Sequence, residues 1–154
     1  MKDRIIDQID RSLLRELQRD ASQSQRDLAE RVGISQNACW RRLRALDSAG
    51  ILQGSSARID RKALGLGLVV FVMLRTRHHS ADWLDDFRRH VQTIPEVVDF
   101  FRIGGDYDYL LKVVTESMDS YDAVYQRLIS KVELDSVTSY FAMEAITEQR
   151  PLPL

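Results

Sequence analysis

Residues 35–47 combine groups that bind nucleic acid with a stripe that can pack on a core. Three arginines stand within four positions, and the only acidic residue of the run is its last. Guanidinium groups bind phosphate oxygens and guanine edges. Cys39, Leu43 and Leu46 recur at the spacing i, i+4, i+7, which predicts a helix with one narrow apolar face. The opposite face of that helix suits a polyanion.

The preceding segment gives this basic helix a context. Residues 24–32 are predicted to form a shorter helix, in which Ser24 is the N-cap and Asp27 stands in a capping-box position. Gly33 is placed to adopt the left-handed conformation that ends a helix. Two short helices joined by a tight turn, the second one basic, are typical of a helix-turn-helix, whose second helix enters the DNA major groove. For residues 35–47 taken alone, a solvated charged face is the simpler interpretation.

The residues expected to contact DNA lie mainly on the polar side of this recognition helix. They are Ser35, Gln36, Asn37, Trp40, Arg41, Arg42, Arg44 and Arg58. Amides at the amino end of the helix can read adenine edges, and the arginines can bind phosphate or guanine. Three of these residues have open alternatives. Arg42 adjoins the apolar stripe and can form an internal ion pair, Trp40 can fold back over the first helix, and Arg58 can be merely solvated.

A second polar cluster follows Gly104, where Asp106 and Asp108 flank Tyr107. Carboxylates accept hydrogen bonds from an ammonium group, and Gly105 lets the backbone approach a ligand closely. Hydroxyls that can serve a ligand's carboxylate come from the last predicted strand, at Thr138, Ser139 and Tyr140. From the residues alone, a hairpin turn with solvated acids is the better interpretation.

Other chemistry is not predicted. His78 and His79 are adjacent, and neighbouring residues of a strand point to opposite faces, so they do not chelate one ion together. No nucleophile, phosphate loop or cofactor motif accompanies Asp106 and Asp108, so we expect neither catalysis nor a cofactor. Cys39, the only cysteine, is expected to be a small buried hydrophobe.

Two groups of elements must position these residues, and together they predict an α+β chain. The N-terminal part is predicted as a winged helix-turn-helix: a first helix at 7–19, the helix-turn-helix, and a hairpin wing at 51–59. The C-terminal part is predicted as a ferredoxin-like βαββαβ sensor domain. Its expected strands are residues 68–74, 97–103, 109–114 and 135–146, with helices that begin at Ser80 and at Ser117 or Asp119. The aromatic and apolar strands imply that a partner chain covers the open face of the sheet.

Length and composition set the outer bounds. With 154 residues, we expect domains at 1–60 and 68–154 with a linker at 61–67, and the Pro-Leu-Pro-Leu end is expected to be extended. The net charge of the chain is −1, and residues 1–60 carry 11 Lys and Arg against 9 Asp and Glu. Because this excess of positive charge is small, any phosphate affinity must come from a local patch. No apolar run approaches the length of a membrane span, and no signal peptide is apparent. A cytoplasmic protein without a membrane partner is expected.

The order of these parts resembles the leucine-responsive regulatory protein / AsnC family of transcription regulators. The resemblance covers nearly the whole chain and rests on Asp10-Arg11, Leu13-Leu14, Leu17-Gln18, residues 28–35, Cys39, Arg42-Leu43, Leu46, residues 50–52 and residues 105–111. It implies double-stranded DNA as a partner, a homodimer built on the sheets that often assembles further, and an amino-acid effector at Gly105, Asp106, Tyr107, Asp108, Thr138, Ser139 and Tyr140.

Two details refine the resemblance. Most members carry prolines at the start of the recognition helix, in a Ser-Pro-Thr-Pro-Cys run, whereas here Gln36 and Asn37 follow Ser35, so the family's operator preference does not carry over. Residues 64–67 and 77–83 resemble the regulators of cysteine catabolism, which implies L-cysteine as effector. We therefore expect a ligand-responsive transcription regulator. The alternatives are an enzyme that metabolises an amino acid and a DNA-packaging protein of the same fold.

Overall fold

The computed structural model describes residues 6–154, which form two compact units. The first unit is the chain up to Arg58 together with Thr147–Leu154, and the second is Ile59–Ile146. The expected domains had placed residues 147–154 with the second. The structure groups them with the first, because Leu152 and Leu154 line an apolar groove there. Among the residues described, no helix is long and apolar enough to cross a bilayer.

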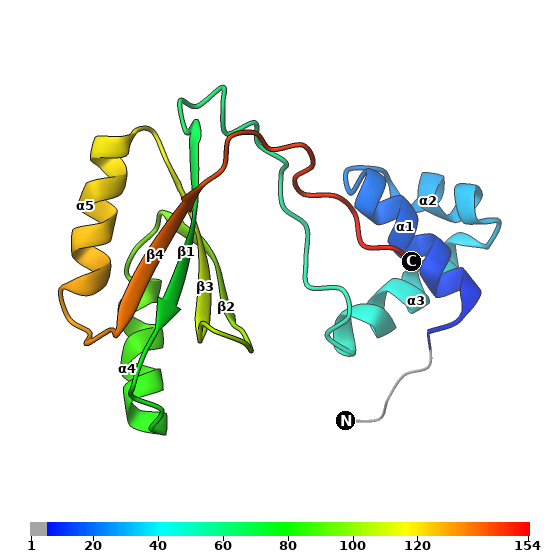
Figure 1. The fold of residues 1–154 in the computed structure, drawn as a ribbon. Coiled ribbons are helices and arrows are strands. Elements are labelled where there is room, and N and C mark those ends of the chain that lie inside the picture. The colour runs from blue at the N-terminus through cyan, green and yellow to red at the C-terminus, as the bar shows by residue number, and fades with distance from the viewer. Residues whose placement is uncertain (1–5) are drawn as a thin grey trace. The chain divides into compact units, whose positions relative to one another are not determined.

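The described part of the first unit, from residue 6 on, contains three helices (Figure 1). They are α1 (Gln8–Arg19), α2 (Gln25–Val32) and α3 (Gln36–Ser48). Each begins after an N-cap, Asp7, Ser24 or Ser35, whose side chain accepts the backbone N–H three residues on. The three helices confirm the predicted helix-turn-helix and the helix before it.

The turn between α2 and α3 depends on Gly33, which has a left-handed backbone with φ of 73°. Its N–H donates to the Glu30 carbonyl at 3.1 Å, and the N–H of Ile34 donates to the Ala29 carbonyl at 3.0 Å. These two bonds satisfy carbonyls at the end of α2 and set the direction in which α3 begins.

Gly33→Ala is expected to destabilise the first unit by about 1 kcal/mol, because an L side chain is strained in this conformation. The space itself is open, since a Cβ there would meet nothing within 4 Å. Urea unfolding measures the loss. Gly67→Ala is the control, because Gly67 has no positive φ and equally open space. Equal effects at the two positions would contradict the strain argument.

Residues 51–59 do not form the predicted hairpin wing, because none of them lies in a strand. Ile51 and Leu52 instead line an apolar groove with Leu14 and Leu17 of α1. The segment's few apolar side chains are used in that packing, and residues 53–58 are exposed, so no alternating pattern remains to pair two strands.

The second unit confirms the predicted βαββαβ order. Its elements are β1 (Leu68–Arg75), α4 (Ala81–Gln92), β2 (Val97–Arg102), β3 (Tyr109–Thr115), α5 (Met118–Ile129) and β4 (Ser136–Phe141). The strands form one antiparallel sheet in the order β2-β3-β1-β4, and both helices cover the same face (Figure 1). The last strand is shorter than predicted and ends at Phe141. The N–H of the next residue, Ala142, still donates to the Val69 carbonyl of β1 at 3.0 Å.

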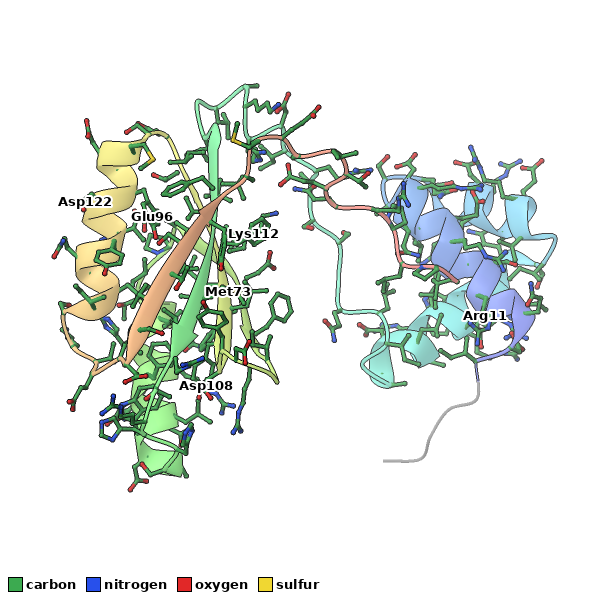
Figure 2. The ribbon with its side chains drawn as sticks, viewed as in Figure 1. Arg11, Met73, Glu96, Asp108, Lys112 and Asp122 are labelled. Carbon is green, nitrogen blue, oxygen red and sulfur yellow. The ribbon has the colours of Figure 1, made fainter. Side chains whose placement is uncertain are left out.

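The two faces of this sheet differ. The face under the helices is buried and includes Val72, Leu111 and Val113, which pack with Phe87 of α4 and Val124 of α5. We call the opposite side the outer face. It carries side chains that the register sets beside one another: Phe71, Met73, Phe101, Leu110, Lys112, Thr138 and Tyr140. Of these, Figure 2 labels Met73 and Lys112. Several of these aromatic side chains are exposed on a single chain.

Candidate DNA-binding face and effector turn

One side of α3 is anchored and the other is open. Cys39 and Leu46 are fully buried, whereas Asn37, Arg41 and Arg44 are exposed. Burial also raises the pKa of the Cys39 thiol, as expected of a packing residue rather than a reactive one. The structure thus places five of the predicted DNA-contacting residues on one exposed face: Gln36, Asn37, Trp40, Arg41 and Arg44.

Trp40 stands in the middle of this face with 48% of its surface exposed. The Arg44 guanidinium carbon lies 5.6 Å from the centroid of its ring, so the two side chains stack. Trp40 therefore does not fold back over α1, which was the alternative that the sequence left open. It lines a depression of about 160 Å³ together with Gln25 and Leu52.

Gln25 was missed in the sequence analysis. It is the first residue of α2, directly after the N-cap Ser24, and it is exposed beside Trp40 and Arg44. The amino end of a helix carries partial positive charge and free N–H groups, which favour a phosphate. The N-cap at Ser24 was the signal that could have identified it.

Arg42 requires a correction, because the structure favours the ion-pair alternative. Its Nη1 lies 2.8 Å from Asp7 Oδ2 and 2.9 Å from Asp10 Oδ1. Asp10 is buried, with 1% of its surface exposed. The two carboxylates raise the pKa of Arg42, Asp7 before Asp10. Arg42 therefore ties α3 to the amino end of α1, and we remove it from the DNA-contacting set.

Two further predicted residues have other surroundings. The Ser35 hydroxyl accepts the Ala38 N–H at 3.2 Å and so positions α3 as its cap. Arg58 lines a shallow depression with residues 17–22, at the carboxyl end of α1. A role for Arg58 at DNA stays a prediction.

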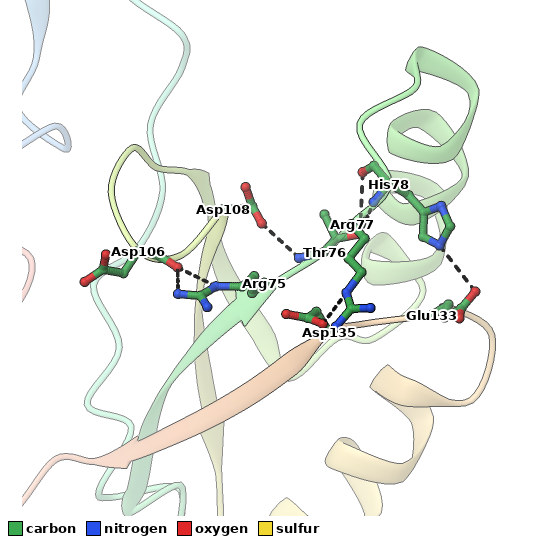
Figure 3. A network of polar contacts seen from close by, with 8 residues as sticks. All are labelled: Arg75, Thr76, Arg77, His78, Asp106, Asp108, Glu133 and Asp135. Carbon is green, nitrogen blue, oxygen red and sulfur yellow. Dashed lines mark hydrogen bonds and ion pairs between the residues drawn. The ribbon is translucent and has the colours of Figure 1, made fainter.

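In the second unit, residues 104–108 form a fixed turn, which we call the effector turn (Figure 3). Asp108 pins it to the end of β1, since its carboxylate accepts the Thr76 N–H at 2.8 Å and its own N–H donates to the Leu74 carbonyl at 2.8 Å. Arg75 donates through Nε to the Asp106 carbonyl at 2.7 Å. Gly105, with φ of 123°, supplies the backbone conformation that this turn needs.

The side chains above the turn gather on the outer face. The Tyr107 hydroxyl donates to Thr138 Oγ1 at 3.3 Å, and Tyr107 also hydrogen-bonds Tyr140. The Arg75 guanidinium carbon lies 5.7 Å from the centroid of the Tyr107 ring. The Asp106 carboxylate is exposed and points away from Arg75 (Figure 3). This cluster offers a carboxylate, three hydroxyls and a guanidinium.

Ser139 does not join the cluster, which corrects its predicted place. It hydrogen-bonds the Tyr121 hydroxyl of α5, so it lies on the helix-covered side of β4. Neighbours in a strand alternate between faces, and Thr138 and Tyr140 therefore lie opposite to it. Asp108 also differs from expectation, because its carboxylate accepts the backbone N–H of Thr76, the residue that follows β1.

An ion pair and a hydrogen bond extend this network beyond β1 (Figure 3). Arg77 Nε lies 2.6 Å from Asp135 Oδ1, and His78 Nε2 lies 3.3 Å from Glu133 Oε2. Together they surround a small polar depression of about 140 Å³. They join the loop after β1 to the loop before β4, next to the paired strands that carry Arg75 and Thr138.

Comparison with known proteins matches both units. The Lrp/AsnC ligand-binding domain matches residues 69–152, and a winged helix-turn-helix DNA-binding domain matches residues 6–53. The chain is 44% identical to the DNA-binding transcriptional activator DecR of Escherichia coli K12, over 97% of this chain and 99% of that protein. It is 42% identical to a glutamate uptake regulatory protein of Zymomonas mobilis, over 98% and 92%.

A solved structure adds a likeness in three dimensions. The crystal structure of a Neisseria meningitidis transcriptional regulator in complex with L-methionine matches with a TM-score of 0.89 and 31% identity, over 97% of each chain. The matches span nearly the whole chain and correspond to the two units of the structure, including the helix-turn-helix that contains α3. The chain belongs to the Lrp/AsnC family and is a DNA-binding transcription regulator rather than an enzyme.

Proposed function

We propose that this protein regulates transcription in response to an amino acid that binds at the effector turn, with L-cysteine as the effector. The observation that carries the proposal is the anchored α3. Buried Cys39 and Leu46 fix one side of the helix, and the exposed Arg41 and Arg44 stand on the other. A basic helix that is anchored on one side as the second helix of a helix-turn-helix is suited to binding in the major groove.

The proposed DNA contacts follow from this face. Gln36 and Asn37 at the amino end read base edges, and Arg41 and Arg44 bind phosphate or guanine. Gln25 at the start of α2 binds a phosphate. Trp40 packs against the sugar-phosphate backbone. The exposure of about half of its surface supports this contact.

A second copy of the chain is proposed to cover the outer face. Phe71 lies opposite Tyr140 in the register, and Phe101 lies opposite Leu110, so the exposed aromatic side chains form a continuous surface. An apolar surface of this kind favours a partner, and a twofold pair presents two recognition helices about 34 Å apart to a roughly palindromic site.

The effector is proposed to bind through its backbone groups. The exposed Asp106 carboxylate accepts hydrogen bonds from the ammonium group, and the hydroxyls of Thr138 and Tyr140 serve the carboxylate. The Neisseria complex with L-methionine supports an amino acid as ligand. The resemblance of residues 64–67 and 77–83 to the regulators of cysteine catabolism supports L-cysteine.

The test is a titration of the purified protein against the DNA upstream of its own gene at physiological salt, with random DNA as competitor. L-cysteine, L-methionine, L-glutamate and L-leucine are added in separate series. A specific complex whose affinity changes with L-cysteine alone supports the proposal. A response to another amino acid keeps the regulator and replaces the effector, and no preference over random DNA defeats the proposed sequence-specific reading.

Replacing both Arg41 and Arg44 by alanine is expected to weaken operator binding by roughly 100-fold, because each contact contributes about 1–3 kcal/mol. The slope of affinity against salt should also fall if either arginine binds phosphate. Arg89→Ala, which removes an exposed arginine from α4, is the control and should leave the operator Kd unchanged. If the double variant binds as the parent does, α3 is not the reading helix.

The effector site has its own variant. Asp106→Ala removes the proposed partner of the ammonium group and should weaken the effect of L-cysteine at least tenfold, because a hydrogen bond to a charged group contributes about 1.5–3 kcal/mol. Operator binding without amino acid should not change. Asp82→Ala, at the start of α4, removes an exposed carboxylate as the control.

A further inference from the structure

The segment Thr147–Leu154, which we call the strap, is held on α1 by hydrogen bonds. Leu152 donates its N–H to Gln18 Oε1 at 2.6 Å, and its carbonyl accepts from Gln18 Nε2 at 3.2 Å. Arg15 Nε donates to the Leu154 carbonyl oxygen at 2.7 Å. Gln18 therefore meets the backbone of Leu152 as a neighbouring strand would, with one donor and one acceptor.

The strap also has an apolar seat. A groove of about 530 Å³ lies between α1 and residues 51–56, and Leu152 and Leu154 line it together with Leu14 and Leu17. Leu154 is half-buried there, whereas Leu152, which is held by its backbone, keeps 70% of its surface exposed. Pro151 and Pro153 restrict the free chain, so that less conformational entropy is lost when the strap binds.

The strap joins two parts of the molecule that the proposed function needs. It follows β4, which carries Thr138 and Tyr140, after a connection at 142–146. It ends on α1, whose Asp10 and N-cap Asp7 hold Arg42 of the recognition helix. The strap is therefore covalently continuous with the strand at the effector turn and hydrogen-bonded to α1, the helix that holds Arg42 of α3.

We propose that the strap regulates DNA binding, because its contact with α1 sets the affinity of the recognition helix for its operator. With the strap in its groove, α1 is rigid and presents Asp7 and Asp10 to Arg42 in one position. With the strap released, α1 is free to shift, and α3 loses the fixed angle at which it meets DNA. The operator-binding part of this proposal rests on the proposed function, whereas the seating of the strap does not.

The test uses the full chain with two independent disruptions of the seat. One variant combines Leu152→Ser with Leu154→Ser and removes the apolar contacts, and the other, Gln18→Ala, removes the paired hydrogen bonds. Met143→Ser and Gln8→Ala are the matched controls, because Met143 is 99% exposed and Gln8 is an exposed glutamine of the same helix. Hydrogen exchange of the α1 amides and the operator Kd are measured for each.

Both disruptions are expected to raise exchange in the second half of α1 at least tenfold and to weaken operator binding about tenfold, while both controls match the parent. Unchanged exchange in both disrupted variants overturns the seating of the strap. Faster exchange with an unchanged operator Kd overturns its regulatory role. A parent chain that binds no operator defeats the proposed function instead, and exchange then still decides whether the strap is seated.

Discussion

Replacing Arg42 by methionine is expected to destabilise the first unit by about 3 kcal/mol, because the change leaves the buried Asp10 carboxylate without its guanidinium partner. The side chain of Asp10 is only 2% exposed, and Arg42 Nη1 lies 2.9 Å from it. The methionine keeps much of the apolar stem of arginine, so the loss comes mainly from the charge. Urea unfolding, followed by Trp40 fluorescence in a Trp83→Phe background, measures the first unit alone.

Two further variants separate this explanation from general damage to α3. Arg41→Met removes the exposed neighbouring arginine and should change stability by less than about 0.5 kcal/mol. Adding Asp10→Leu to Arg42→Met removes the buried carboxylate that faced the guanidinium and should restore part of the lost stability. If the double variant is less stable than Arg42→Met, the cost lies in packing and not in the loss of the guanidinium beside the buried carboxylate.

The same contact predicts a dependence on pH. The backbone N–H of Asp10, and then the Arg42 guanidinium, hold the pKa of Asp7 below its usual value. A carboxyl with a lowered folded pKa contributes stability above its usual pKa, and loses it as the pH falls through the folded value. The difference in stability between the parent and Asp7→Ala should therefore shrink as the medium is acidified below pH 4.

Replacing Phe87 by alanine is expected to cost about 4 kcal/mol in the second unit, the loss typical of a large side chain removed from a full core. Phe87 is completely buried. Its ring centroid lies 5.0 Å from that of Trp83, 5.2 Å from Tyr109 and 5.5 Å from Phe100. These rings come from α4, β2 and β3, so α4 loses its main attachment to the sheet.

Urea unfolding monitored by circular dichroism measures this loss, and Phe101→Ala is the matched control. Phe101 is 53% exposed on the outer face, and its removal should cost the single chain less than about 1 kcal/mol. Because we propose that a second copy covers that face, Phe101→Ala should instead weaken self-association in sedimentation experiments. Comparable losses of chain stability from both variants would contradict the assignment of inner and outer faces.

Local signals in the sequence predicted most of the elements. The caps at Ser24, Ser35 and Ser80 mark helix starts by hydrogen bonds within one turn, and the structure confirms each of them. The left-handed Gly33 likewise follows from its own neighbours. Capping and turn chemistry involve residues close in sequence, so one chain is enough to reveal them.

The errors arose where partners are distant in sequence. Nothing near Arg42 announces a buried acid thirty-two positions away, and nothing in residues 51–59 shows that Ile51 is taken up by α1. Ser139 was a different kind of error, because strand alternation alone separates it from Thr138 and Tyr140. That correction was available from the sequence, whereas the pairing of Arg42 and the seat of the strap required the tertiary structure.

The grouping of residues 147–154 with the first unit has a consequence for biosynthesis. The first unit is discontinuous in the chain, because all of Ile59–Ile146 is translated between its two parts. A nascent chain can form α1, α2 and α3 early, but the groove on α1 stays open until the ribosome has also released the strap. Domains generally fold as units in the order of synthesis. The unit whose helices are synthesised first is therefore completed only after residues 147–154 have been made, and the proposed role of the strap predicts that a ribosome-bound chain lacking them binds operator more weakly.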